Sequence, residues 1–72
     1  MNEPIFNLGE IVYYYNKWSN EIEKGEIINI RQAHLNWDYK IRYYIQKDLI
    51  YQHWIEEKHI SRDDQVLFEF LD

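Results

Sequence analysis

The sequence contains four short β-rich segments in order: FNLGEIV at residues 6–12, GEI at 25–27, YKIRY at 39–43 and WIEEKHI at 54–60. Glycine or polar residues separate them, a pattern typical of short strands joined by turns. Roughly five such strands, curled together, make a small barrel. The sequence therefore predicts an all-β (mainly β) fold, with the barrel at about residues 6–60 of a single domain, 1–72.

Turn residues and runs of apolar residues locate the elements, and clean alternation marks the strand at 39–46. The expected strands are 10–16, 26–34, 39–46 and 49–56. A polar loop from 16 to 24 turns at Ser19-Asn20, further turns lie at 36–38 and 47–48, and a single helical turn at 57–59 precedes Ile60. Gly25 is placed just before the second strand.

The C-terminal extension, residues 61–72, fits two structures. Ser61 and Asp64 are spaced as in a capping box, and the apolar residues that follow recur at helical spacing. Their alternation equally fits one face of a strand. A short helix is the preferred interpretation, and a strand at 62–71 stays open.

Composition excludes several classes of protein. The chain has no cysteine, so it holds no disulfide and no thiolate metal site. His34, His53 and His59 are too scattered for a metal site. No glycine-rich phosphate loop or nucleophile motif is present. We therefore expect no enzyme, no cofactor and no metal. A core this small supplies only about 3–5 kcal/mol of stability, and seven Tyr, three Trp and three Phe are its main material.

The cellular setting is expected to be the cytoplasm. No apolar stretch is long enough to span a membrane, and Met1–Pro4 has neither the basic nor the apolar region of a signal peptide. The richness in Ile, Asn, Lys and Tyr suggests an AT-rich coding sequence. It points to a small accessory protein of a bacterium or phage.

The net charge of −5 is uneven. Residues 1–26 carry five acids and two bases, residues 27–54 two acids and four bases, and residues 55–72 six acids and two bases. The segments therefore sum to −3, +2 and −4. A basic middle between acidic ends weighs against strong nonspecific binding of nucleic acid, which needs a sustained basic face.

In this order the four segments resemble the SH3-like barrel superfamily, in particular Tudor-type domains. Members open with an aromatic residue followed by Gly-acid-x-Val, as at 6–12, and their second strand begins Gly-x-Ile, as at 25–27. Their third strand alternates aliphatic residues and closes on tyrosine, as at 41–43, and their last corner reads as residues 54–60 do. The resemblance covers residues 6–60 and implies the fold and a binding role.

Tudor-type domains hold methylated lysine or arginine in an aromatic cage, where rings attract the cation. By this resemblance Tyr43 falls on a cage position, and Tyr15 and Trp18 lie a residue or two from another. Glu23 or Lys24, and also Gln46, stand where further cage rings would be. At least half of the cage is therefore missing, and a reader of methylated side chains is not expected.

The most unusual local feature is the run Tyr13-Tyr14-Tyr15 followed by Trp18. Val12 and Tyr14 share one face of the strand, and Ile11, Tyr13 and Tyr15 share the other. Core packing explains such rings, but Tyr and Trp also dominate interface hot spots. The residues predicted to bind a protein partner, whose identity is open, are Tyr13, Tyr15, Trp18, Lys40, Arg42 and Tyr43.

Two alternatives stay open. A nucleic-acid-binding face would use Arg31, Lys40, Arg42 and Tyr44, with bases stacking on rings, although these residues equally suit an ordinary solvated strand face. A structural role would use a homodimer in which residues 66–71 cover another copy. The chain is expected to be a monomer or a homodimer.

Overall fold

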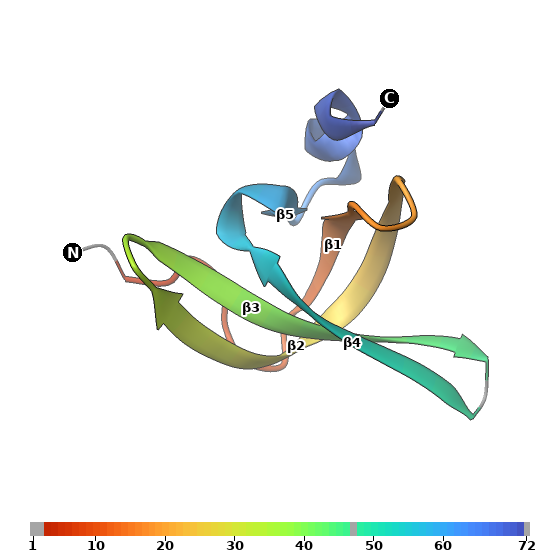
Figure 1. Ribbon diagram of the computed structural model, residues 1–72, viewed down its shortest axis with the longest axis horizontal. Helices are drawn as coiled ribbons and strands as arrows, with labels where there is room; N and C mark the ends of the chain where they lie inside the picture. The colour runs from red at the N-terminus through yellow and green to blue at the C-terminus, as the bar shows by residue number, and fades with distance from the viewer. Residues whose placement is uncertain (1–2, 47, 72) are drawn as a thin grey trace.

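The chain forms one antiparallel sheet of five strands (Figure 1). The computed structural model describes residues 3–46 and 48–71, with the side chains of 44–46 outside the described part. The strands are β1 Ile11–Asn16, β2 Glu21–Ala33, β3 Asn36–Gln46, β4 Leu49–Glu56 and β5 Ile60–Ser61. Two 3-10 helices follow β4 and β5: η1 Glu57–His59 and η2 Asp64–Phe70. The predicted small mainly-β domain is confirmed.

The strand order is β4-β3-β2-β1-β5, so each of the first three strands pairs with the next one in the chain, and β5 pairs with β1. A shift of register between Ile27 and Asn29 bends β2. Among the described residues, the edge strands β4 and β5 do not pair with one another. The sheet curls without closing, so the strand pairing bears out the predicted small mainly-β sheet but does not close it into a barrel.

Strand β4 and helix η1 have the predicted bounds, whereas β2 and β3 are longer than predicted. Strand β2 starts at Glu21, opposite Asn16, so Gly25 lies inside the strand opposite Val12 and not ahead of it. The turn between β2 and β3 is His34-Leu35 and not 36–38. His34 is the first residue of that turn and has a φ of 55°, a left-handed conformation in which His is enriched among non-glycine residues.

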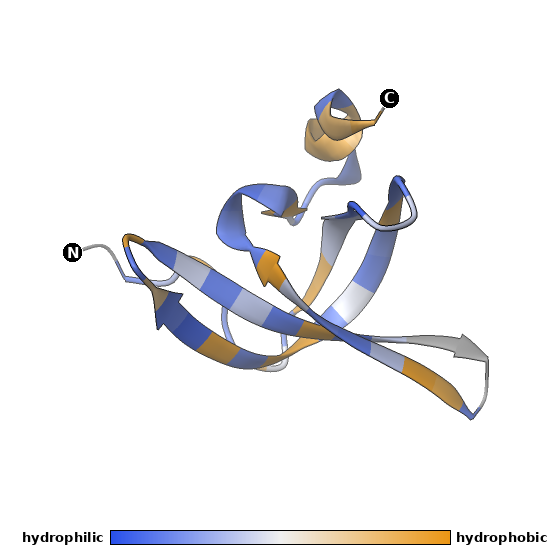
Figure 2. Ribbon diagram, in the orientation of Figure 1, coloured by the Kyte–Doolittle hydropathy of each residue, from blue (hydrophilic) through white to orange (hydrophobic). Residues whose placement is uncertain are grey.

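The core lies on one face of the sheet, which we call the inner face. Val12 and Tyr14 of β1 point into it, while Tyr13 and Tyr15 are half-buried on the outer side, as their alternation predicted. The other buried hydrophobic residues are Phe6, Ile27, Tyr39, Ile41, Ile55, Ile60 and Leu67. Figure 2 shows hydrophobic and hydrophilic residues alternating along β2, as a strand with one covered face requires.

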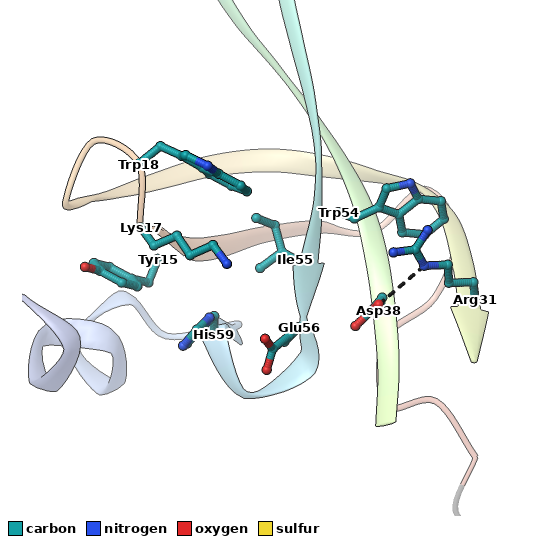
Figure 3. Close-up of a pocket in the computed structure, with 9 residues that line it drawn as sticks. All are labelled: Tyr15, Lys17, Trp18, Arg31, Asp38, Trp54, Ile55, Glu56 and His59. Carbon is teal, nitrogen blue, oxygen red and sulfur yellow. Dashed lines mark hydrogen bonds and ion pairs between the residues drawn. The ribbon is translucent and has the colours of Figure 1, made fainter. Parts of the chain in front are cut away.

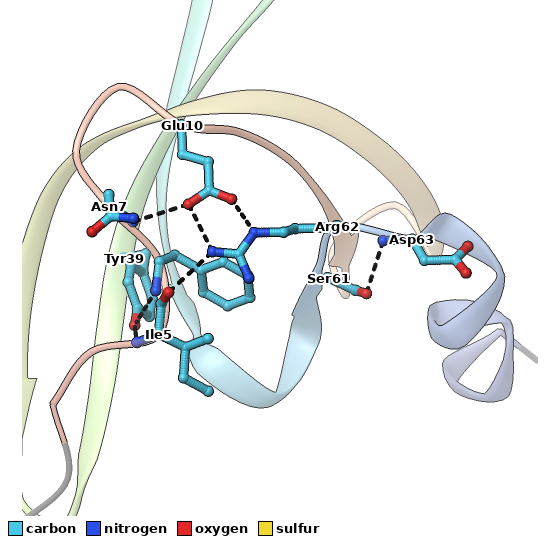
Figure 4. Close-up of polar contacts among 8 residues, drawn as sticks. Ile5, Asn7, Glu10, Tyr39, Ser61, Arg62 and Asp63 are labelled. Atoms are coloured by element: carbon cyan, nitrogen blue, oxygen red, sulfur yellow. Dashed lines mark hydrogen bonds and ion pairs between the residues drawn. The ribbon is translucent and has the colours of Figure 1, made fainter.

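The N-terminal segment is fastened to the sheet by a polar cluster (Figure 4). Arg62 donates two hydrogen bonds to the carboxylate of Glu10 and one to the carbonyl of Ile5 at 3.1 Å. The hydrogen bond from Arg62 lowers the pKa of Glu10 below its usual value. The hydroxyl of Tyr39 accepts a hydrogen bond from the Ile5 amide at 3.1 Å and donates one to Glu57. Residues 5–10 are thus linked to residues 57–62 through part-buried and exposed polar contacts.

The C-terminal segment is helical, which confirms the preferred interpretation and excludes a strand. Its N-cap is Asp63, whose side chain accepts a hydrogen bond from the Gln65 amide at 3.0 Å. The predicted capping box of Ser61 was therefore wrong, since the Ser61 hydroxyl instead accepts from the Asp63 amide at 3.0 Å (Figure 4). Leu67 is buried against the sheet. Within the described residues, no helix has the length and apolar character to cross a membrane.

Candidate functional site

Four aromatic side chains follow one another beyond the core, on the inner face of the sheet. We call them the aromatic row: Trp18, His53, Tyr51 and Tyr43. Trp18 stacks on His53 with ring centroids 4.7 Å apart, and His53 stacks on Tyr51 at 6.1 Å. Tyr43 stacks on Tyr51 at 5.7 Å and lies 6.0 Å from His53.

Strand register explains why the row forms. Tyr43 lies opposite Tyr51 and Ile41 opposite His53 in the β3–β4 ladder, and residues directly opposite share a face. The row therefore continues the inner face from the buried Ile41 towards the end of the hairpin, where β3 and β4 extend past the other strands (Figure 1). At that end no other described strand lies beside the hairpin, so the rings are less covered than the core.

The loop that carries Trp18 is held by Asn16, which is 3% exposed. Its side-chain oxygen accepts a hydrogen bond from the Trp18 amide at 3.0 Å. Its side-chain nitrogen donates to Glu23 at 3.1 Å and to the hydroxyl of Tyr43 at 3.5 Å. Asn16 thereby connects the loop to the row. Burial, followed by the nearby Glu23 carboxylate, raises the pKa of Tyr43.

The row is accessible to solvent at Trp18 and Tyr51. Trp18 is 61% exposed and Tyr51 is 41% exposed, while Tyr43 and His53 are half-buried. The ammonium group of Lys17 lies 5.2 Å from the ring centroid of Trp18. The row therefore exposes two large rings to solvent, packed against two half-buried rings.

The opposite, outer face carries a basic and aromatic cluster. The guanidinium of Arg31 lies 4.1 Å above the ring of Trp54, and the ammonium of Lys40 is 5.9 Å from the same ring. Arg31 also pairs with Asp38 at 3.3 Å. Arg42, further along β3, pairs with Glu26 of β2 at 2.8 Å. Two of these three cations therefore already have a carboxylate partner.

A groove of about 140 Å³ runs beside the end of β4 (Figure 3). On one side are Tyr15, Lys17 and Trp18 from β1 and its loop, and below them is His59 of η1. The remaining lining residues are Arg31, Asp38, Trp54, Ile55 and Glu56. The groove is thus bounded by the uncovered edge of β4 on one side and by exposed rings on the other.

The structure distributes the six residues predicted to bind a partner over two faces. Trp18 and Tyr43 come together in the aromatic row, on either side of His53. Lys40 and Arg42 lie on the outer face, which Arg31 shares. The register places Tyr44 opposite Ile50, and its side chain lies outside the described residues.

The first-strand tyrosines have other contacts. Tyr15 packs its ring on Phe70 at 5.6 Å and on His59 at 5.6 Å, and its hydroxyl donates to Asn20 at 2.9 Å. Tyr13 lies beneath the ammonium of Lys24, 5.6 Å from the ring centroid. The six residues do not make one surface. His53 and Tyr51 were not predicted from the sequence. Their alternate positions in β4, on the face shared with Tyr43, were the signal that could have identified them.

In the described part of the chain, no group of three or more His, Asp or Glu side chains is arranged to hold a metal ion. Compared with known proteins, the chain matches no family model, no curated protein and no solved structure. The function of the candidate site therefore has to be inferred from the geometry of its residues.

Proposed function

We propose that this chain is a non-enzymatic protein-interaction module, and that the aromatic row contacts the partner. The observation that carries the proposal is Trp18, which is 61% exposed and stacked on His53. Tyr and Trp provide large contact areas with few rotatable bonds, and they dominate interface hot spots. The resemblance of residues 6–60 to Tudor-type domains supports the same role, because such domains bind protein segments through rings.

The chemistry of the row favours an extended partner segment with apolar or proline side chains. The rings of Trp18 and Tyr51 are flat, largely apolar and exposed, and the buried Asn16 holds the Trp18 loop beside Tyr43. A partner side chain that stacks on a ring already held by its neighbours orders few additional groups on binding.

Nucleic acid is the second candidate, through the outer face. The stacked pair of Arg31 and Trp54 with nearby Lys40 favours it. The ion pairs of Arg31 and Arg42 and the net charge of −5 weigh against it, because phosphate binding needs unpaired cations.

A selection experiment separates the two candidates. A displayed library of random peptides is selected on the wild-type chain, and the peptide affinity is then measured for wild type, Trp18→Ala and Leu35→Ala. Leu35 is the matched control, being 77% exposed in the β2–β3 turn. We expect Trp18→Ala to weaken binding about 30-fold, the equivalent of a hot spot of about 2 kcal/mol, and Leu35→Ala to leave it unchanged.

A single-stranded oligonucleotide is titrated in parallel at low and high salt. Equal peptide affinity for Trp18→Ala and wild type would contradict the proposal. So would oligonucleotide binding that falls steeply with salt and is lost in Lys40→Glu/Arg42→Glu, because that result assigns the function to the outer face.

A further inference from the structure

Strand β4 leaves one edge unused. It pairs with β3 on one side, and no described strand pairs with its other side. Natural edge strands are usually protected from further pairing by lysine, proline or a short length. The eight residues of β4, LIYQHWIE, contain no Lys, Arg or Pro and a single acid at the end. Leu49, Ile50 and Tyr51 are also each more than 40% exposed.

The sequence of β4 is complementary to itself in one register. In an antiparallel pair, residues directly opposite share a face, so two copies of β4 align only odd with odd and even with even positions. With Gln52 opposite Gln52, the facing pairs are Leu49 with Ile55, Ile50 with Trp54, and Tyr51 with His53. Each of these pairs sets an apolar or aromatic side chain against another.

The neighbouring registers are poorer. With His53 at the centre, Ile50 faces the carboxylate of Glu56. With Tyr51 at the centre, Trp54 faces Asp48. Each alternative register places a charged side chain opposite a large apolar one, and neither side chain is stabilised by that contact.

We propose that two copies of this chain pair through antiparallel β4 strands about a two-fold axis at Gln52, which joins their sheets into one. An isologous contact of this kind closes on itself, so the assembly stops at a dimer. The inference goes beyond the proposed function and does not depend on it.

The surroundings of β4 suit this partner. The hairpin end of the second copy would enter the groove beside Trp54, Ile55 and Glu56 (Figure 3). Its Asp48 would lie opposite Glu56, which Lys58 already neutralises at 3.5 Å, and the groove is also lined by Lys17. Asp48 of the second copy therefore faces one acid, Glu56, with two cations, Lys58 and Lys17, close by to offset the like charges.

The pairing would also join the two aromatic rows, since Tyr51 of each copy faces His53 of the other. One strand contributes a small interface, below the roughly 1,200 Å² of standard complexes, so the dimer is expected to be reversible and to depend on concentration.

Disulfide trapping tests the register, and the natural absence of cysteine makes every introduced thiol unique. In the proposed dimer, Gln52→Cys places two Cβ atoms about 4.5–5.5 Å apart, close to disulfide geometry. The same-residue Cβ atoms of Tyr51→Cys or His53→Cys would be diagonal neighbours, about 7–8 Å apart. Gln65→Cys, exposed on η2, is the control for random collision. We expect Gln52→Cys to cross-link fastest. A rate equal to that of Gln65→Cys, or a faster rate at position 51 or 53, would overturn the proposal.

Sedimentation equilibrium up to about 1 mM tests the dimer itself, since weak interfaces need such concentrations. We expect the mass to rise towards twice 9.1 kDa. Ile50→Lys should hold the chain as a monomer, whereas Leu35→Lys should not.

Lys17→Glu should weaken the dimer, and adding Asp48→Lys should restore it. A monomer at all concentrations, or no effect of Ile50→Lys and of Lys17→Glu, would refute the pairing. Peptide affinity of the row is measured separately, so either proposal can fail alone.

Discussion

Gly25 is the position at which the smallest change should have the largest effect on folding. It lies inside β2, buried, opposite Val12. A Cβ atom built there would lie 2.5 Å from the Cγ2 atom of Ile41 and 2.8 Å from the carbonyl oxygen of Arg42. Both distances are well inside van der Waals contact, so the Gly25→Ala methyl group has no space.

The size of the effect follows from what must move. Extra methyl groups in packed cores cost about 1–3 kcal/mol, and more when the surroundings cannot adjust. Here one of the two atoms belongs to the backbone of β3, so relief would separate β2 from β3. Alanine also reduces the conformational freedom of the unfolded chain, and this offsets the cost by about 0.4–1 kcal/mol. We therefore expect Gly25→Ala to lower the free energy of unfolding by about 2 kcal/mol, roughly half of what a core this small supplies.

Urea unfolding followed by the fluorescence of the three Trp residues measures this loss. Gly9→Asn is the control, because nothing lies within 4 Å of a Cβ there and asparagine tolerates left-handed backbone such as the φ of +84° at Gly9. It should cost about 1 kcal/mol at most. A Gly25→Ala chain within about 0.5 kcal/mol of wild type would refute the packing argument, because surface-like substitutions stay in that range.

Two further substitutions test buried groups. Tyr14→Phe removes the hydroxyl that donates to Glu23 at 3.0 Å, and we expect it to cost about 1.5–3 kcal/mol in urea unfolding, since the acceptor is charged; an unchanged midpoint would contradict this. Burial between Tyr15 and Phe70 lowers the pKa of His59 below 6.5, so the folded state binds fewer protons than the unfolded state there. Stability is therefore fully present above about pH 6.5 and falls as the pH drops below it, and His59→Phe should remove that part of the pH dependence. A difference between wild type and His59→Phe that is constant with pH would contradict it.

The parts of the fold that could be predicted are those with a local signal. The polar turn at 47–48 in the sequence and the polar corner after residue 56 defined β4 and η1, and the parity of Val12 and Tyr14 defined the inner face. The position of Gly25 could not be read locally, because a glycine marks a strand start and a close approach of two strands equally well. The turn at His34 has no typical turn residue.

In the candidate site, too, only the features with a local sequence signal could be predicted. Lys40 and Arg42 alternate with Tyr43 along β3, so the sequence itself already separates them from that ring by face. Grouping them into one surface overlooked this parity. The contact of Trp18 with His53 joins a loop to a strand 35 positions away, and it depends on the curl of the sheet. No local pattern encodes that curl.

The aromatic row is the surface on which we propose that a protein partner binds. The three indole N–H resonances of Trp18, Trp37 and Trp54 are separate reporters, because Trp18 is in the row, Trp54 is on the outer face and Trp37 packs against the core. Titration of a selected peptide into ¹⁵N-labelled chain should shift the Trp18 resonance and leave that of Trp54 in place. A shift of Trp54 with Trp18 unchanged would contradict binding at the aromatic row and assign it to the basic outer face.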